Sequence, residues 1–192
     1  MITALILAAG QSKRMGEPKM LLPWSETTVL EKVIATFKAA EVDEILVVTG
    51  GEREPVEALV GESAWTIFNP KYAEGEMLSS VQAGLAGLNP SVQAVLIGLG
   101  DQPQVQERSV QLVVDEYRNS GASIVVPSFH MRRGHPWLVT NKHWEEILGM
   151  RSPASLRDFL YLHADEIQYV EINNDSILQD LDTPEDYLKF RP

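Results

Sequence analysis

Short apolar runs alternate with helix-length amphipathic segments through the first 127 residues of the chain. The apolar runs are 4–8, 44–49, 66–68, 94–99 and 123–126, and the amphipathic segments are 29–40, 53–60, 77–88 and 107–119. A run that is apolar at every position is typical of a strand covered on both faces, as in a parallel sheet. Strict alternation of strands and helices favours right-handed crossovers. The pattern therefore predicts an α/β fold with a mainly parallel sheet.

The alternation ends at Pro127, and the last third of the chain follows a different pattern. Residues 135–140 predict a strand that need not be parallel to the others. The spacing then predicts helices at 141–148, 155–162 and 184–190, an extended segment at 168–172, and Thr183 as the cap of the last helix. No internal repeat, low-complexity tract or linker interrupts the sequence. We therefore expect one domain over 1–192 with an elaborated C-terminal third.

The charge balance and the missing cysteines exclude several classes of function. Sixteen Lys and Arg against 27 Asp and Glu leave a net charge of −11, which argues against general nucleic-acid binding. An anion site must then be a local exception to the overall field. Without cysteine there are no disulfides, thiolate metal sites or Cys nucleophiles. No stretch reaches the roughly 18 apolar residues of a membrane span, and the N-terminus lacks a basic leader region. These features predict a cytoplasmic protein with neither nucleic acid nor membrane as a partner.

The first apolar run leads into a loop of small residues that carries local positive charge, 7-LAAGQSKRMGEPK-19. Small residues let backbone N–H groups approach an anion, and loops at the carboxyl ends of parallel strands bind ligands in α/β sheets. Arg14 and Lys19 add positive charge, which favours an anion such as a nucleoside triphosphate. The loop is neither G-x-x-x-x-G-K-[ST] nor G-x-G-x-x-G, which argues against a P-loop ATPase and a dinucleotide dehydrogenase. The alternative is a plain strand-to-helix turn with two basic surface residues.

Five motifs along the chain together resemble one family. They are L-A-A-G-x-S-x-R-M-G-x-x-K-x-L-L at 7–22, Asn69 with Gly75 and Ser79-Ser80, G-D-Q-P at 100–103, R-G-H-P at 133–136 and D-L-D-T-P-E-D at 180–186. In this order they resemble the nucleotidyltransferases that mature the molybdenum cofactor. The resemblance is strongest to the molybdenum cofactor cytidylyltransferases, which include accessory proteins of xanthine-dehydrogenase-type enzymes. One departure is an extra residue between Gly75 and the two serines.

The resemblance implies a fold and a reaction. The fold is a Rossmann-like three-layer α/β/α nucleotidyltransferase domain, with a nucleotide-binding part at about 1–127 and an acceptor-binding and closing part at about 128–192. A terminal phosphate of molybdopterin attacks the α-phosphate of a nucleoside triphosphate, and pyrophosphate leaves. The protein aligns the phosphates and neutralises the developing charge, together with Mg²⁺ or alternatively Mn²⁺.

The same resemblance assigns the nucleotide-binding residues. Those expected to line or wrap the nucleotide are Leu7, Ala8, Ala9, Gly10, Ser12, Arg14, Gly16, Lys19, Asn69, Gly75, Ser79 and Ser80. Arg14 suits the β- and γ-phosphates because its planar fork holds two oxygens, whereas Lys19 suits charge developing at the α-phosphate. Ala9 occurs in the cytidylyl branch where the guanylyl branch has a second glycine. Its methyl group leaves less room beside the base, which favours CTP over GTP.

Two aspartates are the expected metal ligands. Asp101 follows the most apolar strand, at the sheet edge where Mg²⁺ could bind with several waters retained. Asp182 is the second expected ligand because it matches the family's D-T-P-E-D motif. Asp180 lies two residues earlier, on the same side of an extended segment, and stays an alternative. Any of the three could instead cap a neighbouring helix. The expected catalytic residues are Lys19, Arg14 and Asp101.

The acceptor side is expected at Arg133, Gly134, His135 and Pro136. His135 would contact the cofactor phosphate or position its attacking oxygen, or be an ordinary histidine at a strand start. Arg157 lies where the family often has an arginine, but the Gly-Asp usually beside it is missing here. The remaining histidines show no metal-ligand spacing and are expected to be ordinary residues; they are His130, His143 and His163.

Several functions remain open at this stage. The leading hypothesis is transfer of CMP from CTP to molybdopterin, with a molybdenum hydroxylase as the recipient of the product. The alternatives are guanylyl transfer from GTP to the same cofactor, nucleotidyl transfer to another phosphorylated acceptor, and a non-catalytic chaperone that carries the finished cofactor. A carrier has no need of a metal-bound triphosphate, so the cations and carboxylates named above favour an enzyme.

Overall fold

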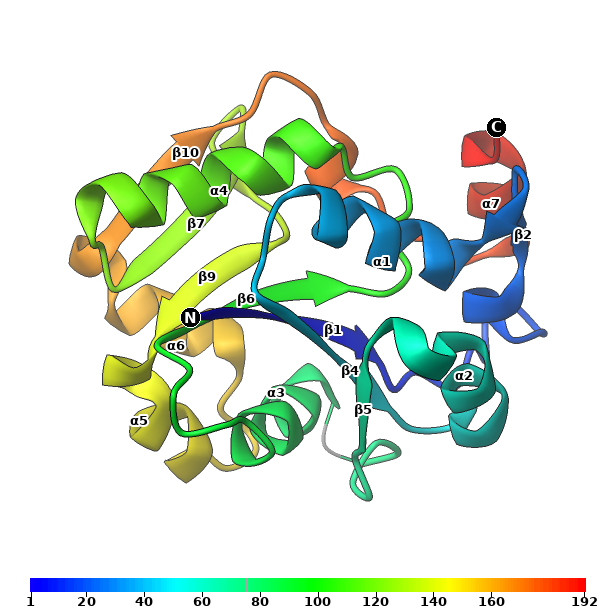
Figure 1. Ribbon diagram of the computed structural model, residues 1–192, viewed down its shortest axis with the longest axis horizontal. Helices are drawn as coiled ribbons and strands as arrows, with labels where there is room; N and C mark the ends of the chain where they lie inside the picture. The colour runs from blue at the N-terminus through cyan, green and yellow to red at the C-terminus, as the bar shows by residue number, and fades with distance from the viewer. Residues whose placement is uncertain (75) are drawn as a thin grey trace.

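A computed structural model describes residues 1–74 and 76–192 as a mixed sheet with helices on both faces (Figure 1). Within these residues the main sheet contains β1 (Ile2–Ala8), β4 (Glu44–Thr49), β5 (Trp65–Phe68), β6 (Ala94–Leu99), β7 (Ile124–Phe129), β8 (Arg132–Arg133), β9 (Trp137–Thr140) and β10 (Ile167–Glu171). The strand order is β10-β7-β9-β6-β1-β4-β5, and β8 pairs with β7. β9 is antiparallel to β6 and β7, and β8 is antiparallel to β7. The mainly parallel sheet is confirmed.

The helices agree closely with the predicted segments. They are α1 (Val29–Ala39), α2 (Arg53–Val60), α3 (Glu76–Ala86), α4 (Glu107–Ser120), α5 (Trp144–Gly149), α6 (Leu156–Leu162) and α7 (Pro184–Phe190). Five 3₁₀ turns within the described ranges are η1 (Lys19–Leu21), η2 (Gly61–Ser63), η3 (Asn141–His143), η4 (Ala164–Glu166) and η5 (Ser176–Leu178), and β2 (Pro23–Trp24) pairs with β3 (Thr27–Thr28). Among the helices described here, none is long and apolar enough to cross a membrane.

The sheet separates two apolar layers, which alternate residues of its strands supply. Ala4 and Ile6 of β1 pack with residues of α1, α2 and α4, whereas Leu5 and Leu7 pack with residues of α3, α5 and α6. This is the two-residue period of a strand covered on both faces. Figure 1 shows α1 and α4 above the sheet and α3, α5 and α6 below it. The three-layer α/β/α arrangement is thus confirmed.

A third apolar cluster joins the two ends of the chain. Its buried members are Met15, Leu22, Trp24, Val29 and Leu181, with Tyr187 and Phe190 of α7 packed against them. The Tyr187 hydroxyl donates a hydrogen bond to the Pro23 carbonyl, 2.6 Å away. The loop after β1 is therefore covered by a segment that lies more than 150 residues later in the sequence.

The start of α7 is defined by a capping box. Thr183 is the cap, as predicted: its hydroxyl accepts from the backbone N–H of Asp186, and the Asp186 carboxylate accepts from the backbone N–H of Thr183. This reciprocal pair holds the chain immediately after Asp182.

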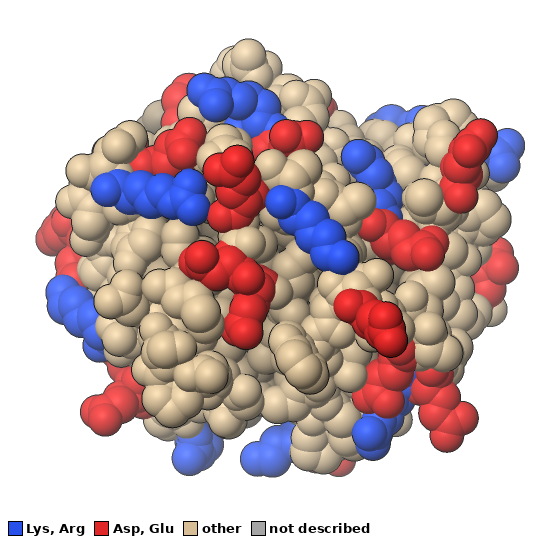
Figure 2. All heavy atoms as spheres, viewed as in Figure 1, with Lys and Arg blue, Asp and Glu red and all other residues tan. Residues whose placement is uncertain are grey.

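Acidic and basic side chains are interspersed over the face of the molecule in Figure 2.

The contact between β6 and α1 gives a test of the packing. A Cβ atom at Gly98 would lie 2.3 Å from Cζ of the buried Phe37. We expect Gly98→Ala to lower the free energy of unfolding by about 1–3 kcal/mol, because the well-packed layer must shift. Gly149→Ala is the matched control, since a Cβ there meets no atom within 4 Å. Urea unfolding of both variants measures the difference.

A double-mutant cycle with Phe37→Leu identifies the cause. The smaller side chain relieves the clash, so the two substitutions together should destabilise less than the sum of the single effects. Strict additivity, or a Gly98→Ala variant as stable as the wild type, would contradict this account.

Candidate active site

The loop after β1 folds back on itself and brings Lys19 into the interior. The Ser12 hydroxyl accepts from the backbone N–H of Lys19 at 3.1 Å, and the Ser12 carbonyl accepts from the N–H of Gly16 at 3.0 Å. Gly16 has φ +80°, a left-handed conformation that favours glycine. Lys19 is only 9% exposed, so it is not one of two basic surface residues on a plain turn. Gly10 is exposed at the start of the loop, where the strand ends.

Four charged residues from three distant segments meet at the carboxyl edge of the sheet; we call them the charged cluster. They are Arg14, Lys19, Asp101 and Asp182. The Lys19 ammonium forms an ion pair with Asp101, donates to the Leu181 carbonyl at 3.1 Å, and lies 3.6 Å from Asp182 Oδ1. Arg14 Nη2 lies 2.9 Å from the same Oδ1 atom. The structure thus brings together the two cations and the two carboxylates that the motifs singled out.

Neither aspartate of the charged cluster is a helix cap. Gln106 is the N-cap of α4, five residues beyond Asp101, and Thr183 is the N-cap of α7. The backbone N–H of Leu181 donates to the carbonyl of Asp101 at 3.1 Å, which ties the closing segment to the end of β6. Carboxylate oxygens are the ligands that hard divalent cations prefer, so the donor atoms of this pair suit such an ion, which would compete with Lys19 and Arg14 for them.

Asp180 lies beside the charged cluster and bonds a different partner. Its carboxylate accepts from the side chain of buried Gln102 at 2.7 Å. Asp180 is exposed as a whole residue, but protein atoms desolvate its carboxyl, and this together with the nearby charge of Asp101 raises its pKa. Asp182, in contrast, contacts both cations of the charged cluster.

The second predicted nucleotide segment forms a buried polar contact. The Asn69 side-chain amide donates to the hydroxyl of Ser79 at 2.9 Å and to that of Ser80 at 3.1 Å. All three residues are buried, and their hydrogen bonds join the turn after β5 to α3. Gly75, predicted for the same segment, lies outside the described residues.

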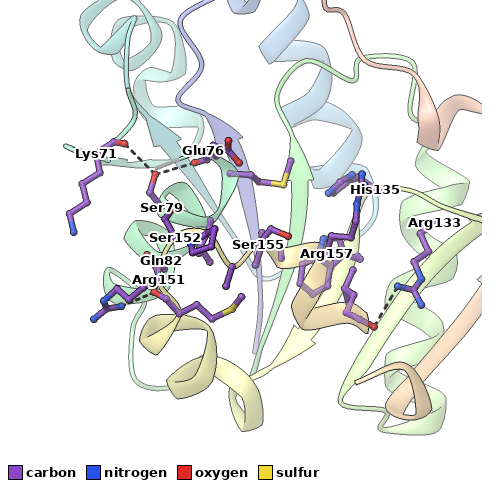
Figure 3. Close-up of a pocket in the computed structure, with 18 of the residues that line it drawn as sticks. Lys71, Glu76, Ser79, Gln82, Arg133, His135, Arg151, Ser152, Ser155 and Arg157 are labelled. Atoms are coloured by element: carbon purple, nitrogen blue, oxygen red, sulfur yellow. Dashed lines mark hydrogen bonds between the residues drawn. The ribbon is translucent and has the colours of Figure 1, made fainter. Parts of the chain in front are cut away.

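A cavity of about 920 Å³ opens between α3, the ends of β7 and β9, and the segment that leads into α6 (Figure 3). Its basic lining residues are Lys71, Arg133, Arg151 and Arg157, and its acidic ones are Glu74 and Glu76. Lys71 and Arg151 lie at one end of the cavity, and His135 and Arg133 lie at the other (Figure 3). Of the predicted acceptor residues, Arg133, Gly134 and His135 line the cavity, whereas Pro136 is buried and does not. Arg157, the less typical match, is also part of the wall.

Gly134 brings the acceptor motif against the closing segment. A Cβ atom there would lie 2.4 Å from the Ile177 carbonyl oxygen, and the backbone N–H of His135 donates to that same oxygen at 3.1 Å. Glycine is therefore needed for this close approach of two backbones. The backbone between β8 and β9, which carries His135, is thereby tied to the segment that leads to Asp182.

His135 and Arg133 differ in their surroundings. His135 is half-buried in the cavity wall, and desolvation of its imidazole lowers its pKa to about 4, so the ring is neutral at pH 7. Arg133 is exposed; its Nε donates to the Tyr169 hydroxyl at 2.8 Å and its guanidinium lies 5.5 Å from the centre of the Tyr169 ring. The cavity therefore presents a neutral imidazole beside a cation that its neighbours orient.

Sequence reasoning missed part of the cavity and one histidine cluster. Lys71 and Arg151 belong to no motif, and only the fold brings them to the same cavity. His143 and His163 were expected to be ordinary residues, but together with Glu166 they place one potential ligand atom each within 4.8 Å of one another. Twenty residues separate the two histidines, so no local spacing could have revealed the cluster.

An α/β sheet with a small-residue loop, two cations and paired carboxylates at its carboxyl edge is an arrangement suited to binding a nucleotide and a metal ion. A profile of the MobA-like NTP transferase domain matches residues 4–167. The chain is 34% identical over 191 residues to the molybdenum cofactor cytidylyltransferase of Escherichia coli (strain K12), covering 97% of this chain and 94% of that protein. The chain belongs to the MobA-like NTP transferase family. The family and enzyme class that the motifs indicated are thereby confirmed.

Two further similarities bear on function and fold. Nicotine blue oxidoreductase of Paenarthrobacter nicotinovorans is 29% identical over 192 residues, covering 96% of this chain and 93% of that protein. The structure of Rv0371c from Mycobacterium tuberculosis H37Rv in complex with manganese has a TM-score of 0.83 at 24% identity, and the match covers 99% of this chain and 97% of that one. The second likeness supports the fold assignment.

The low pKa of His135 predicts a pH-dependent stability. Between pH 6.5 and 4 the unfolded chain binds a proton at this residue that the folded chain does not bind, so stability falls as the pH is lowered. The loss that His135 alone causes is roughly 3 kcal/mol at most, because its pKa falls from 6.5 to about 4. We expect His135→Gln to lose less stability than the wild type over this range, measured by denaturant unfolding at several pH values.

His130→Gln is the matched control, because it makes the same replacement at an exposed position outside the cavity lining. The pH dependence of the other titrating groups is common to all three proteins, so it cancels in the comparison. If His135→Gln has the same pH dependence as the wild type, His135 is not a desolvated neutral group.

Proposed function

We propose that this protein transfers CMP from CTP to the terminal phosphate of molybdopterin or the molybdenum cofactor and releases pyrophosphate, with Mg²⁺ as the metal ion and Mn²⁺ as an alternative. The observation that carries the proposal is the charged cluster, in which the loop after β1, the end of β6 and the closing segment each contribute charged groups. The similarity to a molybdenum cofactor cytidylyltransferase over nearly the whole chain supports the same reaction.

On the nucleotide side, Arg14 and Lys19 contact different phosphates of the triphosphate. The planar guanidinium of Arg14 holds oxygens of the β- and γ-phosphates, and the Lys19 ammonium stabilises charge that develops at the α-phosphate. Ser12 and the Leu181 carbonyl hold Lys19 in position. Asp101 and Asp182 would hold the divalent ion, with Asp180 as the alternative second ligand. A bound divalent ion neutralises phosphate oxygens and orients the triphosphate.

On the acceptor side, the cavity lined by His135 receives the pterin cofactor. The cations in its wall attract the anionic acceptor, and the neutral imidazole of His135 orients the terminal phosphate. An oxygen of that phosphate forms a bond to the α-phosphorus as the bond from the α-phosphorus to the bridging oxygen breaks. Pyrophosphate leaves with the electron pair. In this division about 1–127 bind mainly the nucleotide, and about 128–192 bind the acceptor and close the site. Lys71 and Ser79 of the first part also line the acceptor cavity.

The choice of base rests on Ala9. This residue directly follows β1 and is 6% exposed, and its methyl group takes up space that a glycine would leave open. The smaller pyrimidine fits the reduced space better, so CTP is the proposed donor and GTP the alternative. Cytidylylated cofactor would then pass to a molybdenum hydroxylase.

Two other functions fit part of the observations. A carrier of the finished cofactor would use the cavity but not Lys19, and a transferase for another phosphorylated acceptor would use the charged cluster but not the same cavity residues. A relative at 29% identity is named an oxidoreductase. The first assay therefore includes a parallel reaction with NADH or NADPH.

The first test is pyrophosphate release with Mg²⁺ and molybdenum cofactor, compared among CTP, GTP, ATP and UTP. We expect release with CTP alone, and no oxidation of added NADH or NADPH. Release with GTP instead would contradict the interpretation of Ala9. No release with any of the four, despite measurable CTP binding, would contradict transfer to this acceptor and favour a carrier or another acceptor.

Removing the buried cation tests the mechanism. We expect Lys19→Ala to lower kcat/KM by a factor of 10² to 10³ or more, because loss of one such donor removes about 3–4 kcal/mol of transition-state stabilisation. Lys13→Ala is the matched control, since Lys13 lies in the same loop and is exposed. Circular dichroism establishes that both variants are folded. Normal turnover by Lys19→Ala would show that another group stabilises the α-phosphate.

A further inference from the structure

Away from the charged cluster, two histidines and a glutamate converge on the helical layer formed by α5 and α6. His143 ends η3, His163 follows α6 as its C-cap, and Glu166 ends η4. His163 Nδ1 lies 2.9 Å from Glu166 Oε1, and His143 Nε2 lies 3.5 Å from Glu166 Oε2. The two imidazole rings are 4.7 Å apart between centroids and inclined at 68°. Three donor atoms from three elements therefore surround one small volume.

The outer contacts of His163 are those of a metal ligand. Its Nε2 lies 2.9 and 3.0 Å from the two carboxylate oxygens of Glu146, on the side of the ring away from Glu166. A histidine that ligates a metal through one nitrogen almost always donates its other N–H to a carboxylate, a carbonyl or water, which fixes the tautomer. Glu146 would therefore hold the proton on Nε2 and leave the Nδ1 lone pair facing Glu166.

The charges around the cluster favour a cation at this point. Glu166 and Glu146 place a carboxylate against each nitrogen of the His163 ring, at 2.9 Å in both cases. The same two negative charges would stabilise a divalent ion that replaces the proton on Nδ1. His143 is buried, and its Nε2 is directed toward Ser123 and Glu166.

Two further groups face Glu166. The Lys142 ammonium contacts Glu166 Oε2 at 2.6 Å and competes with any other cation there, whereas Oε1 faces His163. The hydroxyl of Ser123 lies 3.1 Å from His143 Nε2 and 3.2 Å from Glu166 Oε2. A metal ion can thus bind through Oε1 while Lys142 keeps Oε2.

We propose that His143, His163 and Glu166 form a binding site for a divalent transition-metal ion of the Zn²⁺ type, with water completing the coordination. Imidazole nitrogen favours Zn²⁺ and its neighbours in the first transition row, whereas Mg²⁺ prefers oxygen ligands alone. The chemistry of the donors therefore separates this site from the paired aspartates of the charged cluster. A bound ion would link the start of α5, the end of α6 and the turn before β10, and α6 contributes Leu156 and Leu160 to the cavity wall.

The test measures Zn²⁺ binding by equilibrium dialysis with metal analysis, in a background of Asp101→Asn and Asp182→Asn that removes the carboxylate pair. We expect about one Zn²⁺ per chain in this background. His163→Gln and Glu166→Gln should each weaken binding at least tenfold, and Glu146→Gln should weaken it about 10- to 100-fold as an outer contact. Lys142→Ala should tighten binding, because it removes a competing cation.

The matched control is His130→Gln, since His130 is an exposed histidine outside the cluster. We expect it to leave Zn²⁺ affinity unchanged. Co²⁺ substitution gives an independent readout, because a site with two imidazoles and one carboxylate produces visible absorption bands that His163→Gln should abolish. Unfolding curves of the metal-free variants establish that each one is folded.

Two results would overturn the proposal: loss of all Zn²⁺ binding in the Asp101→Asn, Asp182→Asn background, or unchanged affinity in His163→Gln and Glu166→Gln. Zn²⁺ binding and Co²⁺ absorption are measured without CTP or pyrophosphate. Their outcome is therefore independent of whether the proposed transfer reaction is correct.

Discussion

The buried ammonium of Lys19 holds together the carboxyl edge of the sheet. It contacts a carboxylate at the end of β6 and a carbonyl in the closing segment, and its own backbone N–H bonds the loop after β1. A charge with so little exposure is stable only when it is paired and hydrogen-bonded. The three segments must therefore reach their final positions together, because each one supplies a partner that the others require.

The charged cluster differs from the rest of this acidic protein in its charge balance. The chain as a whole carries a net charge of −11, whereas Arg14 and Lys19 match the charges of Asp101 and Asp182 at one edge of the sheet. In the structure described here both cations are paired with Asp182. The third apolar cluster keeps these groups close, since Leu181 is fully buried in it between Asp180 and Asp182.

The sequence predicted most of the fold because burial on both sides of a sheet leaves a local pattern. Residues 4–8 and 94–99 could be read as strands from a few neighbouring side chains, and Thr183 could be read as a cap from the residue three positions later. The cations Lys71 and Arg151, and the pair His143 and His163, left no such pattern. Their proximity arises from the packing of helices on one face of the sheet, which no short stretch of sequence records.

The contact between Gly134 and the Ile177 carbonyl has a consequence for how such a site can diversify. With no room between the two backbones, any change that re-aims His135 also moves the segment that carries Asp180 and Asp182. A different ligand would more readily be accommodated in the cavity by replacing exposed residues of its wall, such as Arg151 and Arg157, whose substitution leaves the backbone in place. The backbone contact at Gly134 therefore allows little change, whereas the exposed side chains of the cavity wall can be replaced without moving the backbone.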